Sequence, residues 1–342
     1  MGKNIIFLPF INGKEGKDWR DNLQKNFLQL DDVKKLNDII NNKRGNKPQA
    51  DKYGDTKSEK ERYETDTTAY LNELRVEKAV RQTKWLQYLL KETADQIRVR
   101  LADIPNTDEH KNDTIVAALP EFFWYDINDN DNHLADDPHY HKPIYENTMY
   151  GSLWDRSNAL AQLTSERRNL IIFAGTVLWK KINQSDHRKD KIYNSMLVYF
   201  GGKLGTVWTK YHTSNIDGLS LPEKYEKVEK ERSVLVPYIE FNNLRFTYDI
   251  CLDFKMGDGN QPLSTTLCAK ENKKTDVNVL IAAGMTLDKC DMDHINSPIV
   301  LRCDGLNPPY AEIAPRGKYD SKNSKILSDG KIIGMLQTDI NV

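Results

Sequence analysis

The stretch LRFTYDICLD, residues 244–253, predicts a short β-strand with a cysteine at its end. Phe246, Tyr248 and Ile250 alternate with other positions, which is typical of a strand with one buried face. Whether this strand ends at Ile250 or at Cys251, the cysteine stands at its carboxyl end. Open α/β sheets place their ligands at that end. The sequence therefore marks Cys251 for comparison with the ends of the other strands.

Further short apolar runs, each bounded by Gly, Pro, Asn or Asp, predict the rest of the sheet structure. Helical patterns lie between them at 153–168 and 264–270. The strongest helical pattern is at 71–97, where apolar residues recur at steps of three and four. Because strands and helices alternate, the fold class is α/β. We predict strands at 114–119, 170–174, 195–200, 202–209, 234–241, 245–250 and 277–282, and a first core strand within 1–9.

A charged segment at about 13–67 separates the first strand from the strongest helix. Its residues are mainly Lys, Asp, Asn and Glu, which predicts one marginal helix followed by a mobile loop through Asn46-Lys47-Pro48. We interpret the segment as a solvated surface excursion, and a dedicated partner-binding element is the alternative. The expected organisation is one domain, 1–342, that carries this insertion.

The composition limits the classes of partner. The 49 basic and 50 acidic side chains leave a formal net charge of -1, which argues against partners such as nucleic acid or a membrane surface. No apolar stretch approaches the roughly 20 residues that span a bilayer, so we expect a soluble protein. The spacings of Cys251, Cys268, Cys290 and Cys303 fit neither a zinc motif nor a disulfide framework. A reducing, cytoplasmic location is the default expectation.

Three chemical groups follow predicted strands. Glu121 comes directly after Ala118-Leu119-Pro120, Lys210 comes after 202–209, and Cys251 ends the strand quoted above. Taken singly, such a lysine is usually a surface residue and such a cysteine an inert core residue. An ionised Glu121 between a buried strand and two aromatic residues needs a charged or hydrogen-bonding partner.

In this order and spacing, the three groups resemble the motifs of the nitrilase superfamily of carbon–nitrogen hydrolases. Leu119-Pro120-Glu121 resembles its glutamate motif, Lys210-Tyr211-His212 its lysine motif and Tyr248-Asp249-Ile250-Cys251-Leu252-Asp253 its cysteine motif. Gly175-Thr176 and Asn194-Ser195 resemble a strand end and the start of the following strand in that family. The resemblance covers the first strand and then roughly 115–283, with a weaker echo at 313–317. It implies a four-layer α-β-β-α sandwich with two mixed sheets face to face.

The resemblance also implies a mechanism, without a metal or another cofactor. Cys251 would attack a carbonyl or nitrile carbon as a thiolate and form a thioester. Glu121 would act as general base and acid. Lys210 and the backbone N–H of Leu252 would stabilise the developing oxyanion. A second glutamate often accompanies this triad, and Glu223 is the candidate, with Glu226 or plain surface charge as alternatives.

The expected function is hydrolysis of a non-peptide carbon–nitrogen bond, most simply in a small amide, by a homodimer or higher homo-oligomer. Carbamoyl compounds, nitriles and acyl transfer to another acceptor remain open. Phe254-Lys255-Met256-Gly257-Asp258-Gly259 departs from the family pattern after the cysteine, so substrate specificity does not transfer. The rival is a catalytically silent protein-binding module of the same fold.

Two loop segments suggest metal sites and are interpreted otherwise. Residues 126–132 alternate oxygen-bearing side chains but lack the glycine and the final glutamate of a calcium loop. His133, His139 and His141 lie with two aspartates in a polar loop, which favours an active-site lid or surface loop over a metal centre. The aromatic residues near Glu121, such as Trp124, are expected to pack in the core or line the substrate pocket.

Overall fold

The chain forms two compact units, one of Met1–Trp19 with Leu90–Val342 and the other of Arg20–Leu89. The computed structural model describes residues 3–10, 14–105, 107, 112–121, 123–124, 145–146, 158–181, 190–212, 225–227, 238–257, 262–285, 287, 298–305, 310–316, 324–327 and 333–340. None of the helices among them is both long and apolar enough to cross a lipid bilayer.

The first sheet of the larger unit is mixed, and its described part has eight strands. Strands β1, β2 and β4 run parallel, whereas β5 is antiparallel to both β4 and β6. The carboxyl ends of β2 and β6 therefore lie at the same edge. The strands are β14 (Leu336–Ile340), β1 (Lys3–Pro9), β2 (Thr114–Leu119), β4 (Leu170–Lys181), β5 (Asp190–Phe200) and β6 (Lys203–Thr209) in spatial order, with β3 (Tyr145–Glu146) on β4 and β7 (Tyr225–Lys227) on β5.

The second sheet is also mixed, and its described part has six strands. Its centre is parallel, because β10 pairs in parallel with both β9 and β11. The other pairs are antiparallel. The strands are β13 (Lys325–Ile326), β12 (Tyr310–Ala314), β11 (Ile299–Asp304), β10 (Val277–Ala282), β9 (Leu244–Ile250) and β8 (Tyr238–Phe241) in spatial order.

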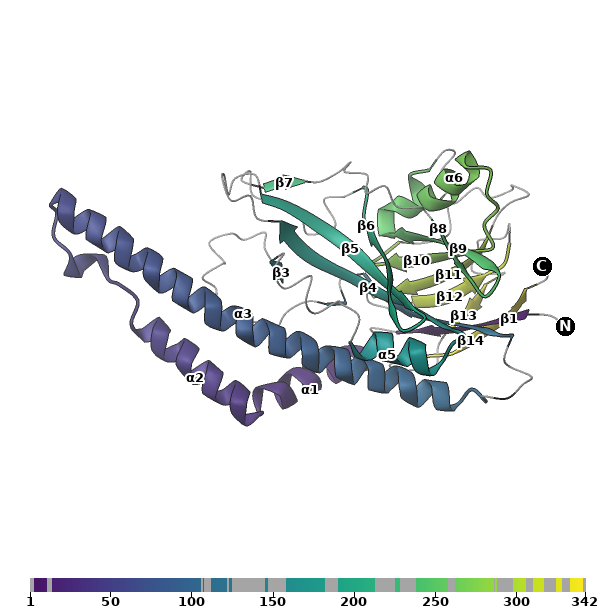
Figure 1. Ribbon diagram of the computed structural model, residues 1–342, viewed down its shortest axis with the longest axis horizontal. Coiled ribbons are helices and arrows are strands. Elements are labelled where there is room, and N and C mark those ends of the chain that lie inside the picture. Colours follow the sequence, from purple (N-terminus) through teal and green to yellow (C-terminus); the bar gives the residue numbers. More distant parts are fainter. Residues whose placement is uncertain are drawn as a thin grey trace. The chain divides into compact units, whose positions relative to one another are not determined.

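The hydrophobic core lies between the two sheets, which face each other (Figure 1). Aromatic rings meet across this interface, since Phe173 of β4 lies 6.1 Å from both Phe246 and Tyr248 of β9 between ring centroids. The thiol of Cys303 on β11 also donates to the carbonyl of Ala118 on β2 at 3.3 Å. Burial of the apolar residues on both inner faces is the main stabilising contribution of this unit.

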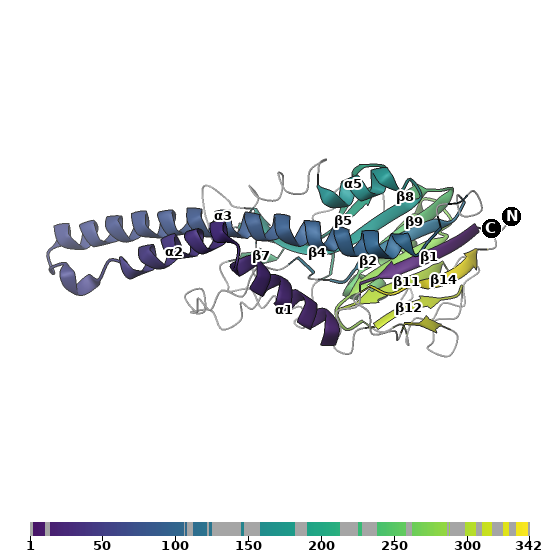
Figure 2. The ribbon, with the colours of Figure 1, turned by 90° about the horizontal axis from the view of Figure 1, so that it is seen from below.

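Helices cover the outer faces and complete the four layers. Helix α5 (Ala159–Glu166) packs on β4, β5 and β6, and the last turns of α3 (Lys57–Ala102) lie near it, where Arg98 pairs with Glu166. Helix α6 (Leu263–Lys270) packs on β9 of the second sheet, and Figure 1 labels both elements. Figure 2 shows α5 beside β5 of the first sheet. The predicted α/β sandwich with two face-to-face mixed sheets is confirmed.

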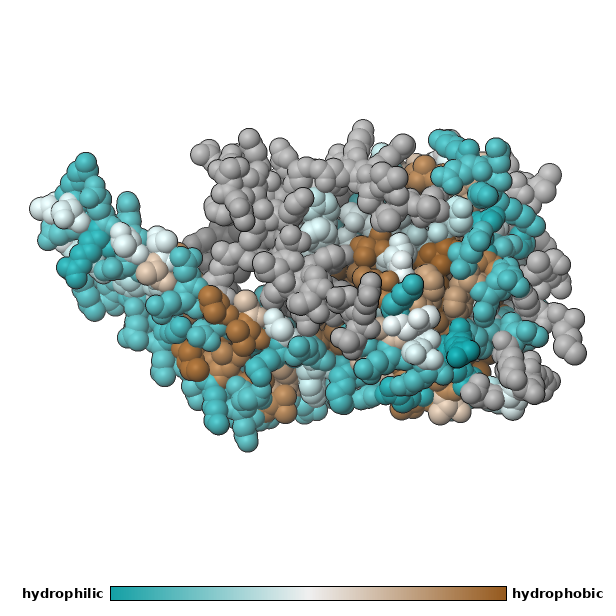
Figure 3. Space-filling model, viewed as in Figure 1, coloured by the Kyte–Doolittle hydropathy of each residue, from teal (hydrophilic) through white to brown (hydrophobic). Residues whose placement is uncertain are grey.

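The smaller unit is helical, and it has α1 (Lys14–Leu28, from Arg20 on) and α2 (Asp31–Gly45) where one marginal helix was expected. The chain is not helical at 46–49, where the loop was predicted. The short 3-10 turn η1 (Ala50–Lys52) and α3 up to Leu89 follow. Phe27 packs on Trp85 at 5.3 Å between ring centroids, and Leu36, Ile40 and Leu74 form a small core. Figure 3 shows a largely hydrophilic surface here with one apolar patch over α2 and α3.

Most predicted elements occur with shifted ends. The strands at 114–119 and 277–282 are confirmed in full as β2 and β10. The strand predicted at 170–174 continues to Lys181, because Gly175 forms a bulge and does not end it. Likewise, β5 begins at Asp190, ahead of Asn194. The helix predicted at 71–97 extends to 57–102 as α3.

Candidate active site

Glu121 stands in the turn after β2, and two close backbone approaches fix this turn. Gly175 in β4 has a φ of +66°, and a Cβ there would meet the carbonyl oxygen of Pro120 at 2.5 Å. On the other side, a Cβ at Gly305 would meet Pro120 at 2.9 Å. Glycine is needed at position 175 both for its backbone angle and for this contact. The turn therefore presents the Glu121 side chain in one place.

A buried ion pair joins Glu121 to Lys210. Nζ of Lys210 donates to Oε1 of Glu121 at 2.9 Å, and both side chains are 0% exposed. Nδ2 of Asn194, on β5, donates to the same oxygen at 2.8 Å. The backbone of Asn194 also accepts from the N–H of Lys210 at 2.8 Å. The structure thus brings together the carboxylate and the ammonium that the sequence placed after separate strands.

Cys251 directly follows β9, as predicted, and begins the five-residue 3-10 helix η5 (Cys251–Lys255). Its side chain belongs to the core cluster between the sheets, and the residue is 8% exposed. Its φ is +48°, a left-handed conformation that costs a residue other than glycine about 1–3 kcal/mol. Such strain is common where a fold aims a reactive side chain, so the backbone angle supports a functional interpretation of this thiol.

The helix that carries Cys251 is tied to the segment that follows Lys210. The carboxylate of Asp253 accepts from the N–H of Tyr211 at 2.9 Å and from the N–H of His212 at 2.7 Å. Nδ1 of His212 lies 3.0 Å from the same carboxylate. Because Asp253 comes two residues after Cys251 and Tyr211 one residue after Lys210, the nucleophile and ammonium segments meet at this carboxylate.

A second buried carboxylate lies behind the cysteine, on the outer side of β9. Asp249 accepts from Oγ of Ser264 at 2.6 Å, from the N–H of Ser264 at 3.0 Å and from Nδ2 of Asn278 at 2.7 Å. Complete burial raises the pKa of Asp249 to about 7, although these hydrogen bonds oppose the rise. The network fastens the first turn of α6 to the strand that leads into Cys251.

Two residues of this site had no assigned role in the sequence. Asn194 was noted only as the start of a strand, and Asp253 only as part of the cysteine motif. A weak signal existed for both, since each is a polar residue next to an otherwise apolar strand. Several predicted residues lie outside the described part of the chain, namely Glu223, the three histidines and the calcium-like stretch 126–132. Of Glu226, only the backbone is described. The structure therefore does not test the roles proposed for them. Leu252 is the second residue of η5.

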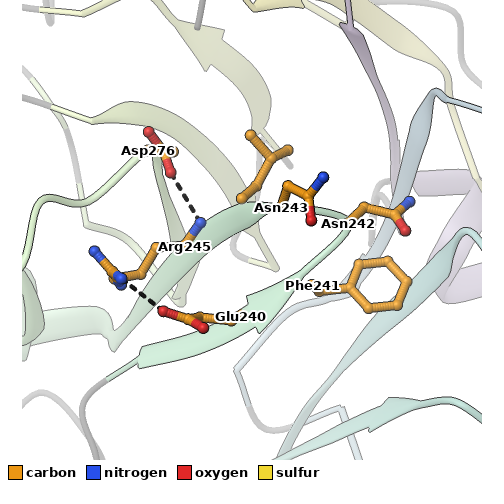
Figure 4. A pocket seen from close by; sticks show the side chains of 7 residues that line it. Glu240, Phe241, Asn242, Asn243, Arg245 and Asp276 are labelled. Carbon is orange, nitrogen blue, oxygen red and sulfur yellow. Dashed lines mark hydrogen bonds and ion pairs between the residues drawn. The ribbon is translucent and has the colours of Figure 1, made fainter.

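Polar residues also surround a pocket at the turn between β8 and β9 (Figure 4), which lies at the other end of β9 from Cys251. Arg245 pairs there with Glu240 at 2.6 Å, and its N–H donates to Asp276 at 2.9 Å. These charges pair with one another. Open α/β sheets bind ligands at the carboxyl ends of their strands, so the end that carries Cys251 is the better candidate.

Among the residues that the structure describes, no group of three or more His, Cys, Asp or Glu side chains is arranged to hold a metal ion.

No model of a known protein family matches the sequence, and no curated protein matches it. The solved structures that match include the glutamine-dependent NAD+ synthetase from Acinetobacter baumannii, with a TM-score of 0.40, 10% identity, and coverage of 76% of this chain and 43% of that chain. The corresponding enzyme from Cytophaga hutchinsonii gives a TM-score of 0.35, 11% identity, and coverage of 68% and 38%. An N-terminal amidase gives a TM-score of 0.32 and 13% identity, with coverage of 58% of this chain and 45% of that chain.

The chain therefore spans less than half the length of each of these proteins. With TM-scores this low, the assignment of a function rests on the site itself.

Proposed function

We propose that the chain is a carbon–nitrogen hydrolase of the nitrilase type, with Cys251, Glu121 and Lys210 as its catalytic residues. The observation that carries this proposal is the fully buried pair of Glu121 and Lys210. The residue after Lys210, Tyr211, is hydrogen-bonded to Asp253 in the helix of Cys251. Burying two charges costs several kcal/mol per ion in lost hydration. Their mutual attraction does little more than offset this cost, so a buried ion pair adds little net stability. A pair of this kind, next in the chain to residues that are hydrogen-bonded to the helix of Cys251, is better explained by catalysis than by stability.

In the acylation half-reaction, Glu121 takes the proton of the Cys251 thiol. The thiolate sulfur then forms a bond to the carbonyl carbon of the amide, whose oxygen becomes an oxyanion. Lys210 and the backbone N–H of Leu252 donate to this oxygen. When the tetrahedral intermediate collapses, the carbon–nitrogen bond breaks, and Glu121 returns its proton to the departing amine or ammonia. The product on the enzyme is a thioester.

In the hydrolysis half-reaction, Glu121 removes a proton from a water molecule, and the resulting hydroxide attacks the thioester carbon. The second tetrahedral intermediate uses the same oxyanion donors as the first. Its collapse breaks the carbon–sulfur bond and releases the carboxylic acid, and Glu121 gives its proton to the departing sulfur, which restores the Cys251 thiol. Contact with Lys210 and Asn194 keeps the Glu121 carboxylate in one position, which suits a group that transfers protons in both halves.

The substrate class that we propose is a small amide, with carbamoyl compounds and nitriles as the nearest chemical relatives. The same thioester also reacts with an amine or another acceptor, which would make the protein an acyltransferase. We further propose that the protein forms a homodimer or a higher homo-oligomer. Light scattering on the purified chain tests that part separately, and a monomer at micromolar concentration contradicts it.

The experiment is a screen of amides, ureides and nitriles for ammonia release, with Cys251→Ala as the control. We expect turnover of at least one class by the native chain, and none by the variant. Glu121→Gln is expected to be nearly inactive, because both half-reactions use Glu121 for proton transfer, and an acyl adduct on Cys251 in the intact mass would show that thioester hydrolysis is slowed more than thioester formation. Equal ammonia release by the native chain and Cys251→Ala excludes this mechanism.

A catalytically silent chain gives a different set of results. Cys251 then reacts with iodoacetamide like an ordinary thiol, whose pKa is about 8.5, and none of the compounds is turned over.

A further inference from the structure

We propose that Asp253 is a positioning residue of the active site, which fixes the helix of Cys251 against the segment that carries Lys210. This inference rests on the proposed function and adds a residue outside the Glu-Lys-Cys triad. Asp253 is fully buried. A buried carboxylate is costly unless hydrogen bonds compensate it, so its partners indicate what it holds in place.

Those partners are consecutive residues of one backbone segment. One carboxylate oxygen of Asp253 accepts from the N–H of Tyr211 at 2.9 Å, and the other accepts from the N–H of His212 at 2.7 Å. The His212 ring adds a third contact at 3.0 Å. Hydrogen bonds to a charged acceptor are stronger than those between neutral groups. Two such bonds to adjacent amides fix both the distance and the direction of the segment.

The carboxylate acts across the sandwich. Lys210 follows β6 of the first sheet, whereas Asp253 lies in η5 after β9 of the second sheet. The spacing of the ammonium and the thiol therefore depends on how the ends of two sheets are held together. The bonds from Asp253 to Tyr211 and His212 join the two ends next to both reactive groups.

The strained backbone of Cys251 gives this link a second role. A left-handed residue persists only where its surroundings hold it there, and Cys251 has a φ of +48° at the start of a helix of five residues. Asp253 lies in the same short helix, so its hydrogen bonds anchor that helix and hold Cys251 in its strained conformation. When the anchor is lost, the cysteine is free to relax away from Lys210.

Position and charge predict opposite effects for Asp253. The anionic carboxylate disfavours a second anion two residues away, so its charge alone works against a Cys251 thiolate. In the proposed mechanism the Lys210 cation stabilises the thiolate, so a carboxylate that holds the two segments together works in favour of the thiolate. The substitution Asp253→Asn removes the charge, keeps the size of the side chain and leaves one acceptor for two N–H donors. The direction of its effect on Cys251 therefore distinguishes the two roles.

The test measures the rate of alkylation of Cys251 by iodoacetamide from about pH 5 to pH 9 in the full chain, with the site read by peptide mass. In this reaction the thiolate sulfur bonds to the methylene carbon and iodide leaves. For Asp253→Asn we expect the midpoint of the pH profile to rise by about one unit and the rate at neutral pH to fall about tenfold. A midpoint that is unchanged or lower overturns the inference.

His212→Gln is the matched control, because it keeps both backbone N–H donors and removes only the ring. Its midpoint is expected to match the native one, and an equal shift in both variants overturns the backbone link. A native midpoint near about 8.5 overturns the proposed function and the inference with it. A depressed native midpoint that Asp253→Asn leaves in place overturns the inference alone.

If Asp253→Asn fails to fold, amide hydrogen exchange in the native chain provides the measurement. The N–H groups of Tyr211 and His212 then need to be protected well above the level of exposed loop amides. Exchange of both at the rate of a solvated loop overturns the inference.

Discussion

Lys210 and Glu121 form an ion pair of 2.9 Å in which neither side chain is exposed, and the two residues are separated by 89 positions in the chain. Each comes directly after or within two residues of a strand of the same sheet, at the edge where the carboxyl ends of β2 and β6 lie. The pair therefore depends on the topology of the sheet, and its energetics are open to a direct test.

Removing one partner of this pair leaves the other charge buried alone. We expect Lys210→Met and Glu121→Gln each to lower the free energy of unfolding, by about 3–5 kcal/mol for the former. The double variant is expected to be more stable than the sum of the two losses predicts, because it buries no unpaired charge. Urea unfolding of the four proteins measures this coupling. Strictly additive losses contradict a buried ion pair.

The glycine beneath the Glu121 turn gives a prediction with a built-in control. Gly175 and Gly201 both have φ near +60°, but only at Gly175 would a Cβ meet another atom, the carbonyl oxygen of Pro120 at 2.5 Å. We expect Gly201→Ala to lower the free energy of unfolding by about 1 kcal/mol, because alanine at this position has to adopt the left-handed backbone angle. Gly175→Ala is expected to cost clearly more and to abolish activity, because it displaces the turn that holds Glu121.

Thermal unfolding and ammonia release measure the two effects. Equal losses of stability in the two variants contradict the close approach at Gly175.

Asn194 supports the same carboxylate from another strand. Its Nδ2 donates to Glu121 at 2.8 Å, and its buried Oδ1 has no hydrogen-bond partner within the described part of the chain. Asn194→Ala removes a donor to a buried charge, which lowers the free energy of unfolding by about 1–3 kcal/mol. Asn194→Asp keeps the shape but sets two carboxylates against each other. We therefore expect activity to fall in the order native, Asn194→Ala, Asn194→Asp, in an initial-rate assay.

An Asn194→Asp variant as active as Asn194→Ala contradicts this order.

Local patterns were sufficient for elements whose own residues define them. The runs at 114–119 and 277–282 are apolar and end at breakers, and both are strands throughout. The first part of α3 lacks an apolar stripe, so it was not predicted. It is supported by charge pairs such as Lys57 with Glu61 and Arg62 with Asp66, each four positions apart. Gly175 was interpreted as a strand end, although the strand continues past it through a bulge.

The residues of the candidate site also divide into those that the sequence identified and those whose roles only the structure shows. Glu121, Lys210 and Cys251 each follow a predicted strand, which is a local signal, and they were identified together because their order and spacing resemble the motifs of the nitrilase superfamily. The roles of Asn194 and Asp253 were missed because their partners are distant in the chain, 73 positions away for Asn194 and 42 or 41 for Asp253. A polar residue at a strand end shows no partner in the sequence, and only the pairing of the sheets supplies one.

Asp249 predicts how stability depends on pH. Burial raises its pKa in the folded chain to about 7 from 3.8, so the folded state binds the proton more tightly than the unfolded state. The contribution of this group is therefore fully present below about pH 4 and is lost as pH rises through about 7. Between pH 5 and pH 7 the loss amounts to about 2–3 kcal/mol, at about 1.4 kcal/mol per unit.

Asp249→Asn cannot titrate, so its free energy of unfolding, measured in urea at both pH values, is expected to change less than that of the native chain. Parallel pH profiles of the two proteins would show that Asp249 is ionised throughout this range, held as a carboxylate by the Ser264 and Asn278 donors.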